Sequence, residues 1–202
     1  LLDDLCDQGV DVSRVKKIQG FNGVHFLSIL PDGDREFIYY RSGSAASTIR
    51  YTDIDEDYIK TAKILHINSI LQATSPVARD TVLESAKLTR KNGVLVSYDT
   101  NLRLNMWTLR EASKAFREIL PYINLLFPSH PTETLQLLGL ESEHSVIKHC
   151  LELGVDVVAV KSGQNGAVIG TKESIGRVNS IAPLGVVDTT GASADSTSDR
   201  QS

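Results

Sequence analysis

"SPVARDTVLESAKLTRKNGVLVSYDTN", residues 75–101, contains the pattern of a helix followed at once by that of a strand. Residues 75–93 carry apolar side chains at helical spacing, with Ser75 as an N-cap, Pro76 in the first turn and Gly93 at the end. Residues 94–101 continue as an apolar strand that ends in polar residues. A helix that leads directly into such a strand is typical of an α/β fold.

The same alternation extends along the chain in both directions. It predicts further strands at 62–70, 123–129 and 155–163, and helices at 109–123, 131–139 and 143–154. Strands that are apolar throughout, separated by helices, indicate a mostly parallel sheet covered on both faces. Because right-handed crossovers bring the carboxyl ends of parallel strands to one edge, we expect the polar strand ends to share a crevice. These ends are Asp99-Thr100-Asn101, Pro128-Ser129, Lys161-Ser162-Gly163 and Asp188-Thr189-Thr190.

Residues 21–45 follow a different pattern, that of a β-hairpin attached to the α/β body. Apolar side chains alternate with a period of two on either side of a Pro31-Asp32-Gly33 turn. We expect residues 1–20 and 46–192 to form the body, incomplete at both ends, and residues 193–202 to be a disordered or aberrant tail. The body is expected to be incomplete because the chain begins at Leu1 and lacks an apolar helix after residue 192.

The amino-acid composition limits the kinds of protein and partner that fit this chain. The 202 residues are 41% hydrophobic and 23% charged with a net charge of −4, which is ordinary for a folded soluble protein and suggests neither a nucleic-acid nor a membrane partner. There is no membrane-crossing apolar run and no secretory signal at the first residues, so a cytoplasmic protein is predicted. The distant Cys6 and Cys150 favour free thiols over a disulfide. His144, His149 and Cys150 lie on one predicted helix, but without a second cluster they do not indicate a metal site.

Four further segments carry polar groups that suit a ligand. "YYRSGSAAS" (39–47) places Tyr39 and Arg41 on one face of a strand, and "SYDTNLRLNMW" (97–107) places Arg103 just beyond a strand end. Taken singly, each also fits a solvated strand end or a surface loop. "VKSGQNGAVIG" (160–170) is a strand, a glycine turn and a strand, which equally fits an ordinary hairpin. "VDTTGA" (187–192) is more specific, because hydroxyls and successive backbone N–H groups there can surround an anion.

Together with "FPSHPTETLQLLG" (127–139), these segments resemble the ribokinase-like (PfkB) carbohydrate kinases, in family order, from about residue 5 to residue 192. The branch that they resemble most is that of the 2-keto-3-deoxygluconate kinases, which phosphorylate a sugar acid with ATP. The resemblance implies a ribokinase-like three-layer α/β sandwich with a mostly parallel central sheet and a small β-hairpin lid. It also implies ATP and Mg²⁺ as cofactors, a small-molecule sugar acid as substrate, and a homodimer through the lid hairpin.

The resemblance assigns roles to particular residues. Tyr39, Arg41 and Arg103 fall where the keto-acid kinases hold their substrate, and two guanidinium groups suit a carboxylate. Glu133 matches a family position that helps to organise Mg²⁺, although His130 replaces the asparagine of that motif, and His25 stands where the branch often has tyrosine. The nucleotide side is assigned to Lys161, Gly163, Gly166, Gly191 and Ala192.

The position of the general base departs from the family. Family members continue the anion hole as Gly-Ala-Gly-Asp, whereas this chain reads Gly191-Ala192-Ser193-Ala194. Asp195 lies one place late, a rotation of roughly 100° on a helix. We therefore predict an inactive internal fragment of a sugar-acid kinase, with Asp195 as the candidate base. The alternatives are another ribokinase-family sugar kinase, acting on fructose or ribose, and a non-catalytic sugar- or nucleotide-binding remnant.

Overall fold

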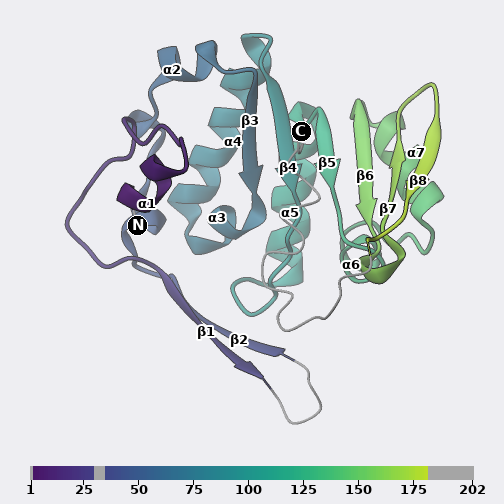
Figure 1. Cartoon of the computed structure of the whole chain (residues 1–202), viewed down its shortest axis with the longest axis horizontal. Helices are drawn as coiled ribbons and strands as arrows, with labels where there is room; N and C mark the ends of the chain where they lie inside the picture. Colours follow the sequence, from purple (N-terminus) through teal and green to yellow (C-terminus); the bar gives the residue numbers. More distant parts are fainter. Residues whose placement is uncertain (1, 30–34, 182–202) are drawn as a thin grey trace.

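A computed structural model describes residues 2–29 and 35–181 of the chain (Figure 1). The strands are β1 (Val24–Ile29), β2 (Arg35–Tyr40), β3 (Ile64–Asn68), β4 (Leu95–Asp99), β5 (Leu125–Phe127), β6 (Val157–Lys161), β7 (Ala167–Gly170) and β8 (Ile175–Val178). The α-helices are α1 (Leu2–Asp7), α2 (Glu56–Thr61), α3 (Ser69–Thr74), α4 (Pro76–Lys91), α5 (Leu109–Ile119), α6 (Thr132–Leu138) and α7 (Glu143–Glu152). Short 3₁₀ turns are η1 (Ala45–Thr48), η2 (Tyr51–Asp53), η3 (Leu120–Tyr122) and η4 (Gly163–Asn165).

Six strands form one sheet in the order β3-β4-β5-β6-β7-β8. The first four are parallel to one another, and β7 and β8 are added as antiparallel strands. The predicted α/β class, with a mostly parallel sheet and a separate two-stranded antiparallel hairpin, is therefore confirmed. The carboxyl ends of the parallel strands meet at the edge nearest the β1–β2 hairpin (Figure 1).

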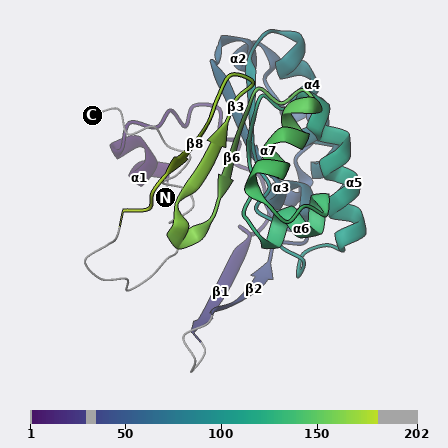
Figure 2. The ribbon, with the colours of Figure 1, turned by 90° about the vertical axis from the view of Figure 1, so that its right-hand side faces the viewer.

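Helices α3 to α7 cover one face of this sheet (Figure 2). Since the parallel strands follow in sequence order and their crossovers share one hand, the connecting helices fall on the same side. The main core lies there and contains the side chains of Val96, Tyr98, Phe116, Leu126 and Val158, all at most 3% exposed. On the opposite face, within the described residues, Ile64, Leu95 and Ile169 keep 37–49% of their surface exposed, so the expected cover over both faces is seen on one face only in this part of the chain.

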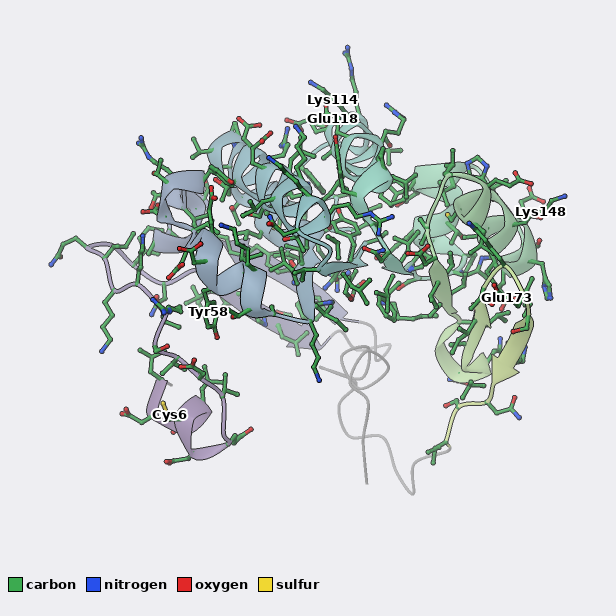
Figure 3. All side chains as sticks on the ribbon, turned by 90° about the horizontal axis from the view of Figure 1, so that it is seen from above. Cys6, Tyr58, Lys114, Glu118, Lys148 and Glu173 are labelled. Carbon is green, nitrogen blue, oxygen red and sulfur yellow. The ribbon has the colours of Figure 1, made fainter. Side chains whose placement is uncertain are left out.

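The sequence signals at the helix ends act as predicted. Ser75 Oγ accepts a hydrogen bond from the backbone N–H of Ala78 at 3.0 Å, Pro76 begins α4, and Gly93 follows its end with a φ of +75°. Helix α5 begins with a capping box in which Thr108 and Glu111 satisfy each other's backbone N–H groups. Its outer face carries Lys114 and Glu118, which point away from the sheet (Figure 3).

A smaller apolar cluster lies beneath the β4–α5 loop. Trp107, 7% exposed, packs there with Leu102, Ala112 and Ala115. The guanidinium carbon of Arg79 lies 5.3 Å from the centroid of the Trp107 ring, while the indole Nε1 is buried without a hydrogen-bond partner among the described residues. This cluster supports the loop that carries Arg103.

Some elements differ from the sequence prediction. Helix 109–123 ends at Ile119, and the 3₁₀ turn η3 containing Pro121 follows, because proline lacks the N–H that an α-helix needs. Helices α1, α2 and α3 and strand β8 were not predicted, since each is short and lacks a clear apolar period. The strand predicted at 62–70 ends at Asn68, and α3 begins at Ser69. The predicted Pro31-Asp32-Gly33 turn and residues 182–202 lie outside the described residues.

The β1–β2 hairpin extends away from the body (Figure 1). Its register pairs His25 with Tyr39 and Phe26 with Ile38. Because neighbouring side chains alternate between faces, His25, Phe37 and Tyr39 gather on one face, with ring centroids 5.8–6.0 Å apart. The other face carries Val24, Phe26, Ile38 and Tyr40, each 45–60% exposed.

Candidate functional site

The predicted substrate residues come together where the hairpin meets the β4–α5 loop. Arg103 Nε donates to the hydroxyl oxygen of Tyr39 at 3.0 Å, across 64 positions of sequence. The guanidinium carbon of Arg41 lies 5.8 Å from the centroid of the Tyr39 ring. Tyr39 therefore contacts two guanidinium groups, that of Arg103 through its hydroxyl and that of Arg41 through its ring, and this arrangement gathers positive charge for an anionic ligand.

Two polar atoms beside this group have no hydrogen-bond partner among the described residues. They are Arg41 Nε and Ser44 Oγ, and both are buried. Gly23 leaves room for them, because a Cβ there would lie 3.0 Å from Arg41 Cγ and 3.4 Å from Ser44 Oγ. A buried polar atom without a partner is costly, so a ligand that supplied acceptors here would gain binding energy.

The loop after β4 is held by hydrogen bonds to its own backbone. Ser69 Oγ donates to the carbonyl oxygens of Thr100 and Asn101, and Asn101 adopts a positive φ of 25°. Asn105 Nδ2 donates to the carbonyl oxygen of Phe37 in β2 at 2.8 Å. Asn105 thus provides a second link between loop and hairpin, one that the sequence analysis missed because it lies outside the strand-end pattern.

The side chain of Glu133, 5% exposed, joins two loops at the carboxyl edge of the sheet. Its Oε1 accepts from the backbone N–H of Leu102 at 2.7 Å, and its Oε2 accepts from that of Ser129 at 2.8 Å and from Thr100 Oγ1. Both carboxylate oxygens are thus engaged by protein donors. Glu133 fits an indirect role toward Mg²⁺, through the loops that it positions, better than direct coordination.

Lys161, at the end of β6, forms an ion pair with Asp99 at the end of β4. Lys161 Nζ lies 2.8 Å from Asp99 Oδ1, and each side chain is 11% exposed. Asp99 Oδ1 also accepts from the backbone N–H of Asn101 at 3.2 Å. Asp99 therefore connects the predicted nucleotide side of the edge to the loop that carries Arg103. Lys161 and Asp99 both belong to the polar strand ends that the sequence analysis expected to share a crevice.

The predicted glycine turn contains η4. Gly163 has a φ of +55°, and a Cβ added there would meet nothing within 4 Å, so the space above it is open. Gly166 has a φ of +75°, and its Cβ would lie 2.0 Å from the carbonyl oxygen of Val178. The absence of a side chain at Gly166 therefore allows the backbone of β8 to pack against the turn. Gly163 instead faces open space that a ligand can enter.

Beside this turn lies a polar pocket of about 750 Å³. Its lining includes His130, Ser162, Gln164, Asn165 and Arg177. A volume of this size is in the range of nucleotide-sized ligands. Gly191 and Ala192 of the predicted anion hole, and the candidate base Asp195, lie outside the described residues.

Glu143 links two sides of this pocket. It accepts from Ser162 Oγ at 2.6 Å, and Arg177 Nη2 lies 3.0 Å from each of its carboxylate oxygens. The hydrogen bond from Ser162, together with the guanidinium of Arg177, lowers the pKa of Glu143 below its usual value. Glu143 is therefore held as a carboxylate that neutralises Arg177.

The cysteines and histidines do not form a metal centre in the part of the chain that the structure describes. Residues 2–29 and 35–181 contain no group of three or more histidine, cysteine, aspartate or glutamate side chains that could hold a metal ion. Cys6 is exposed on α1 (Figure 3), and Cys150 is a buried free thiol whose pKa burial raises to about 12. No described helix is both long and apolar enough to cross a membrane.

A mostly parallel sheet, a projecting two-stranded hairpin and polar groups gathered at the carboxyl edge define an α/β protein of the ribokinase-like class. The chain belongs to the pfkB family of carbohydrate kinases, whose family model matches residues 1–193. This confirms the resemblance stated above.

Individual relatives agree with this assignment. The chain is 31% identical over 195 residues to the 2-dehydro-3-deoxygluconokinase of Bacillus subtilis, covering 95% of this chain and 60% of the relative. It is 32% identical over 168 residues to probable fructokinase-5 of Arabidopsis thaliana, covering 83% and 51%. A putative ribokinase II from E. coli, solved in complex with ATP and Mg²⁺, superposes with a TM-score of 0.83 at 28% identity, covering 95% and 61%. The chain thus spans between 51% and 61% of the length of these three proteins.

Proposed function

We propose that the protein to which this chain belongs is an ATP-dependent sugar kinase whose substrate is 2-keto-3-deoxygluconate or a similar sugar acid. The observation that carries the proposal is the grouping of Arg41 and Arg103 around Tyr39. A neutral sugar would not require two guanidinium groups, whereas a carboxylate matches their planar fork. Likeness to a 2-dehydro-3-deoxygluconokinase supports the same substrate class.

ATP is proposed to bind beside the turn that contains Gly163 and Gly166, with Lys161 facing its phosphates. The polar pocket next to this turn supports the proposal, as does a structural relative solved with ATP and Mg²⁺. When bound, Mg²⁺ would neutralise charge on the transferred phosphoryl group. Glu133 would act on the site by holding the two loops whose backbone N–H groups it accepts from.

Likeness to plant fructokinases favours a second candidate, a kinase for a neutral sugar. Isothermal titration calorimetry of the 202-residue chain with 2-keto-3-deoxygluconate, fructose and ribose separates the two. We expect heat of binding with the sugar acid and a much weaker signal with the neutral sugars. Preferential binding of fructose or ribose would instead establish the neutral-sugar kinase.

The chain as written is proposed to bind its ligands but to transfer phosphate slowly. Ala194 stands at the family position of the general base, whose contribution to rate is typically about 10²–10⁴-fold. A coupled assay for ADP release, on protein whose folding is verified by circular dichroism, tests this. Turnover at a rate normal for a sugar kinase would contradict it and would make Asp195 the candidate base. Binding without turnover would fit a non-catalytic binding module.

The partner of the hairpin is proposed to be a second copy of the chain. An exposed apolar face on the hairpin is formed by Val24, Phe26, Ile38 and Tyr40, and a two-stranded sheet is marginally stable alone. Sedimentation equilibrium is expected to show a dimer that Phe26→Glu dissociates, whereas Val10→Glu, outside the hairpin, leaves it unchanged. A monomer at all concentrations would remove the dimer from the proposal.

A further inference from the structure

Gly23 lies where the chain enters strand β1, opposite the place where it leaves strand β2. Val24 pairs with Tyr40 in the antiparallel register, so the next residues along the two strands are Gly23 and Arg41. Side chains that stand opposite each other in such a pair share one face of the sheet. A side chain at residue 23 would therefore lie on the face that carries Tyr39 and Arg41.

The side chain of Arg41 occupies the space that a side chain at residue 23 would need. A Cβ at Gly23 would lie 3.0 Å from Arg41 Cγ and 3.5 Å from Arg41 Cα. Carbon atoms that are not bonded normally stay about 3.5–4.0 Å apart, so the contact with Cγ would be too short. Gly23 is not one of the glycines with a positive φ, so its lack of a side chain provides space and not a special backbone conformation.

Hydrogen bonds hold the backbone around this contact. The N–H of Ala45 donates to the carbonyl oxygen of Phe21 at 2.9 Å, and the N–H of Ser44 donates to that of Arg41 at 3.1 Å. Strand pairing begins one residue further on, at Val24. An added Cβ would therefore displace the side chain of Arg41, which can rotate about its χ angles, more readily than the backbone.

The course of this side chain determines where the Arg41 guanidinium lies. The guanidinium carbon is 5.8 Å from the centroid of the Tyr39 ring, and Nε is buried without a hydrogen-bond partner among the described residues. Arg103 reaches the same tyrosine through its hydroxyl. Rotation of the Arg41 side chain would thus separate the two guanidinium groups while Arg103 kept its own hydrogen bond.

We propose that Gly23 is a positioning residue that determines specificity for a sugar acid, because its lack of a side chain lets Arg41 hold its guanidinium beside Tyr39 and Arg103. The proposal rests on the proposed function, since it assigns the carboxylate of the ligand to these two arginines. Gly23 acts through Arg41 and does not itself contact the ligand. A side chain at this position should weaken binding of a sugar acid more than binding of a neutral sugar.

The first experiment detects the position of Arg41 without any ligand. In ¹H–¹⁵N NMR spectra of the 202-residue chain, the buried Arg41 Nε–H should give a resonance that exchanges slowly with water. Gly23→Ala should shift this resonance and speed its exchange, and Gly23→Val should do so further. Gly176 in β8 is the matched control, because its φ is not positive and a Cβ there meets nothing within 4 Å. Gly176→Ala and Gly176→Val should leave the Arg41 resonance unchanged.

The second experiment measures affinity by calorimetric titration with 2-keto-3-deoxygluconate and with fructose. Gly23→Ala should weaken binding of the sugar acid by about tenfold, since a charge-assisted hydrogen bond to the carboxylate is lost. In the Arg41→Ala variant, which has no Cγ, the same change at residue 23 should have no further effect on affinity. This double-mutant cycle separates positioning of Arg41 from general damage to the hairpin.

The two experiments separate this proposal from the proposed function. An Arg41 resonance unchanged in both Gly23 variants would overturn the role of Gly23, whichever sugar binds. So would an equal loss of affinity in the Arg41→Ala background, or equal weakening of sugar-acid and fructose binding. A shifted Arg41 resonance, in a chain that gives no heat with the sugar acid before substitution, would support positioning by Gly23 and contradict the sugar-acid kinase.

Discussion

Arg103 holds the hydroxyl of Tyr39 at 3.0 Å, and this hydrogen bond joins the β4–α5 loop to strand β2 of the hairpin. Asn105 adds a second link from the same loop to the carbonyl oxygen of Phe37. The hairpin is therefore oriented by the loop that we propose to bind the sugar acid. A ligand that binds Arg103 would therefore act directly on the hydrogen bond that orients the hairpin.

Replacing Arg103 by lysine should weaken sugar-acid binding by about tenfold or more, because lysine cannot present the planar fork that suits a carboxylate. Calorimetric titration with 2-keto-3-deoxygluconate measures the effect. Arg110→Lys, on the exposed start of α5, is the matched control and should bind as the unaltered chain does. Equal affinity of the Arg103→Lys variant would show that this guanidinium does not contact the ligand.

Glu133→Gln should lower the free energy of unfolding by about 3 kcal/mol, because an amide NH₂ would replace one of the acceptors that faces buried donors. The loss arises at Leu102, Thr100 and Ser129, which donate to the carboxylate. Urea unfolding followed by circular dichroism measures it. The same change at Glu152, exposed at the end of α7, should cost much less. A similar loss in both variants would contradict the structural role assigned to Glu133.

The two glycines Gly166 and Gly139 allow a test of backbone approach. Both have a positive φ, but a Cβ at Gly139 meets nothing within 4 Å whereas one at Gly166 lies 2.0 Å from the oxygen of Val178. Gly139→Ala should cost about 1–2 kcal/mol of unfolding free energy from strain alone. Gly166→Ala should cost at least about 2 kcal/mol more, since β8 must move away. An equal loss of unfolding free energy in the two variants would mean that the backbone at Val178 moves aside at no cost in free energy.

Glu143 should make part of the stability depend on pH. Its pKa is lowered from the usual value of 4.5 by the hydrogen bond from Ser162 and by Arg177. A lowered pKa means stabilisation that is present above pH 4.5 and is lost as the pH falls through the folded-state pKa. The difference in unfolding free energy between the unaltered chain and Glu143→Gln should therefore shrink from pH 7 to pH 3. A difference that stayed constant would exclude the ionised carboxylate as its source.

The alternation of apolar strands and helices was sufficient to predict the four parallel strands of the main sheet. The signal was strong at 75–101 because the cap at Ser75, the stop at Gly93 and the apolar strand agree with one another. Strand β8 was not predicted because its four residues are all exposed, so burial imposes no pattern on them.

The candidate site could be predicted in part. Tyr39 and Arg103 were named from their motifs, and the topology brings them within hydrogen-bonding distance. The pairing of Lys161 with Asp99 was not predicted, because it joins β4 and β6 across the intervening strand β5. The hydrogen bonds of Glu133 likewise depend on how two loops meet, which periodicity does not report.

The packing of Trp107 beneath Arg79 gives the molecule a built-in optical reporter. Trp107 is the only tryptophan in the chain, it is 7% exposed, and it shares the β4–α5 loop with Arg103. Its fluorescence emission should therefore be that of an indole shielded from water, quenchable only weakly by iodide. A sugar acid bound at Arg103 would perturb this emission from four residues away, so ligand affinity could be read from the chain without an attached dye.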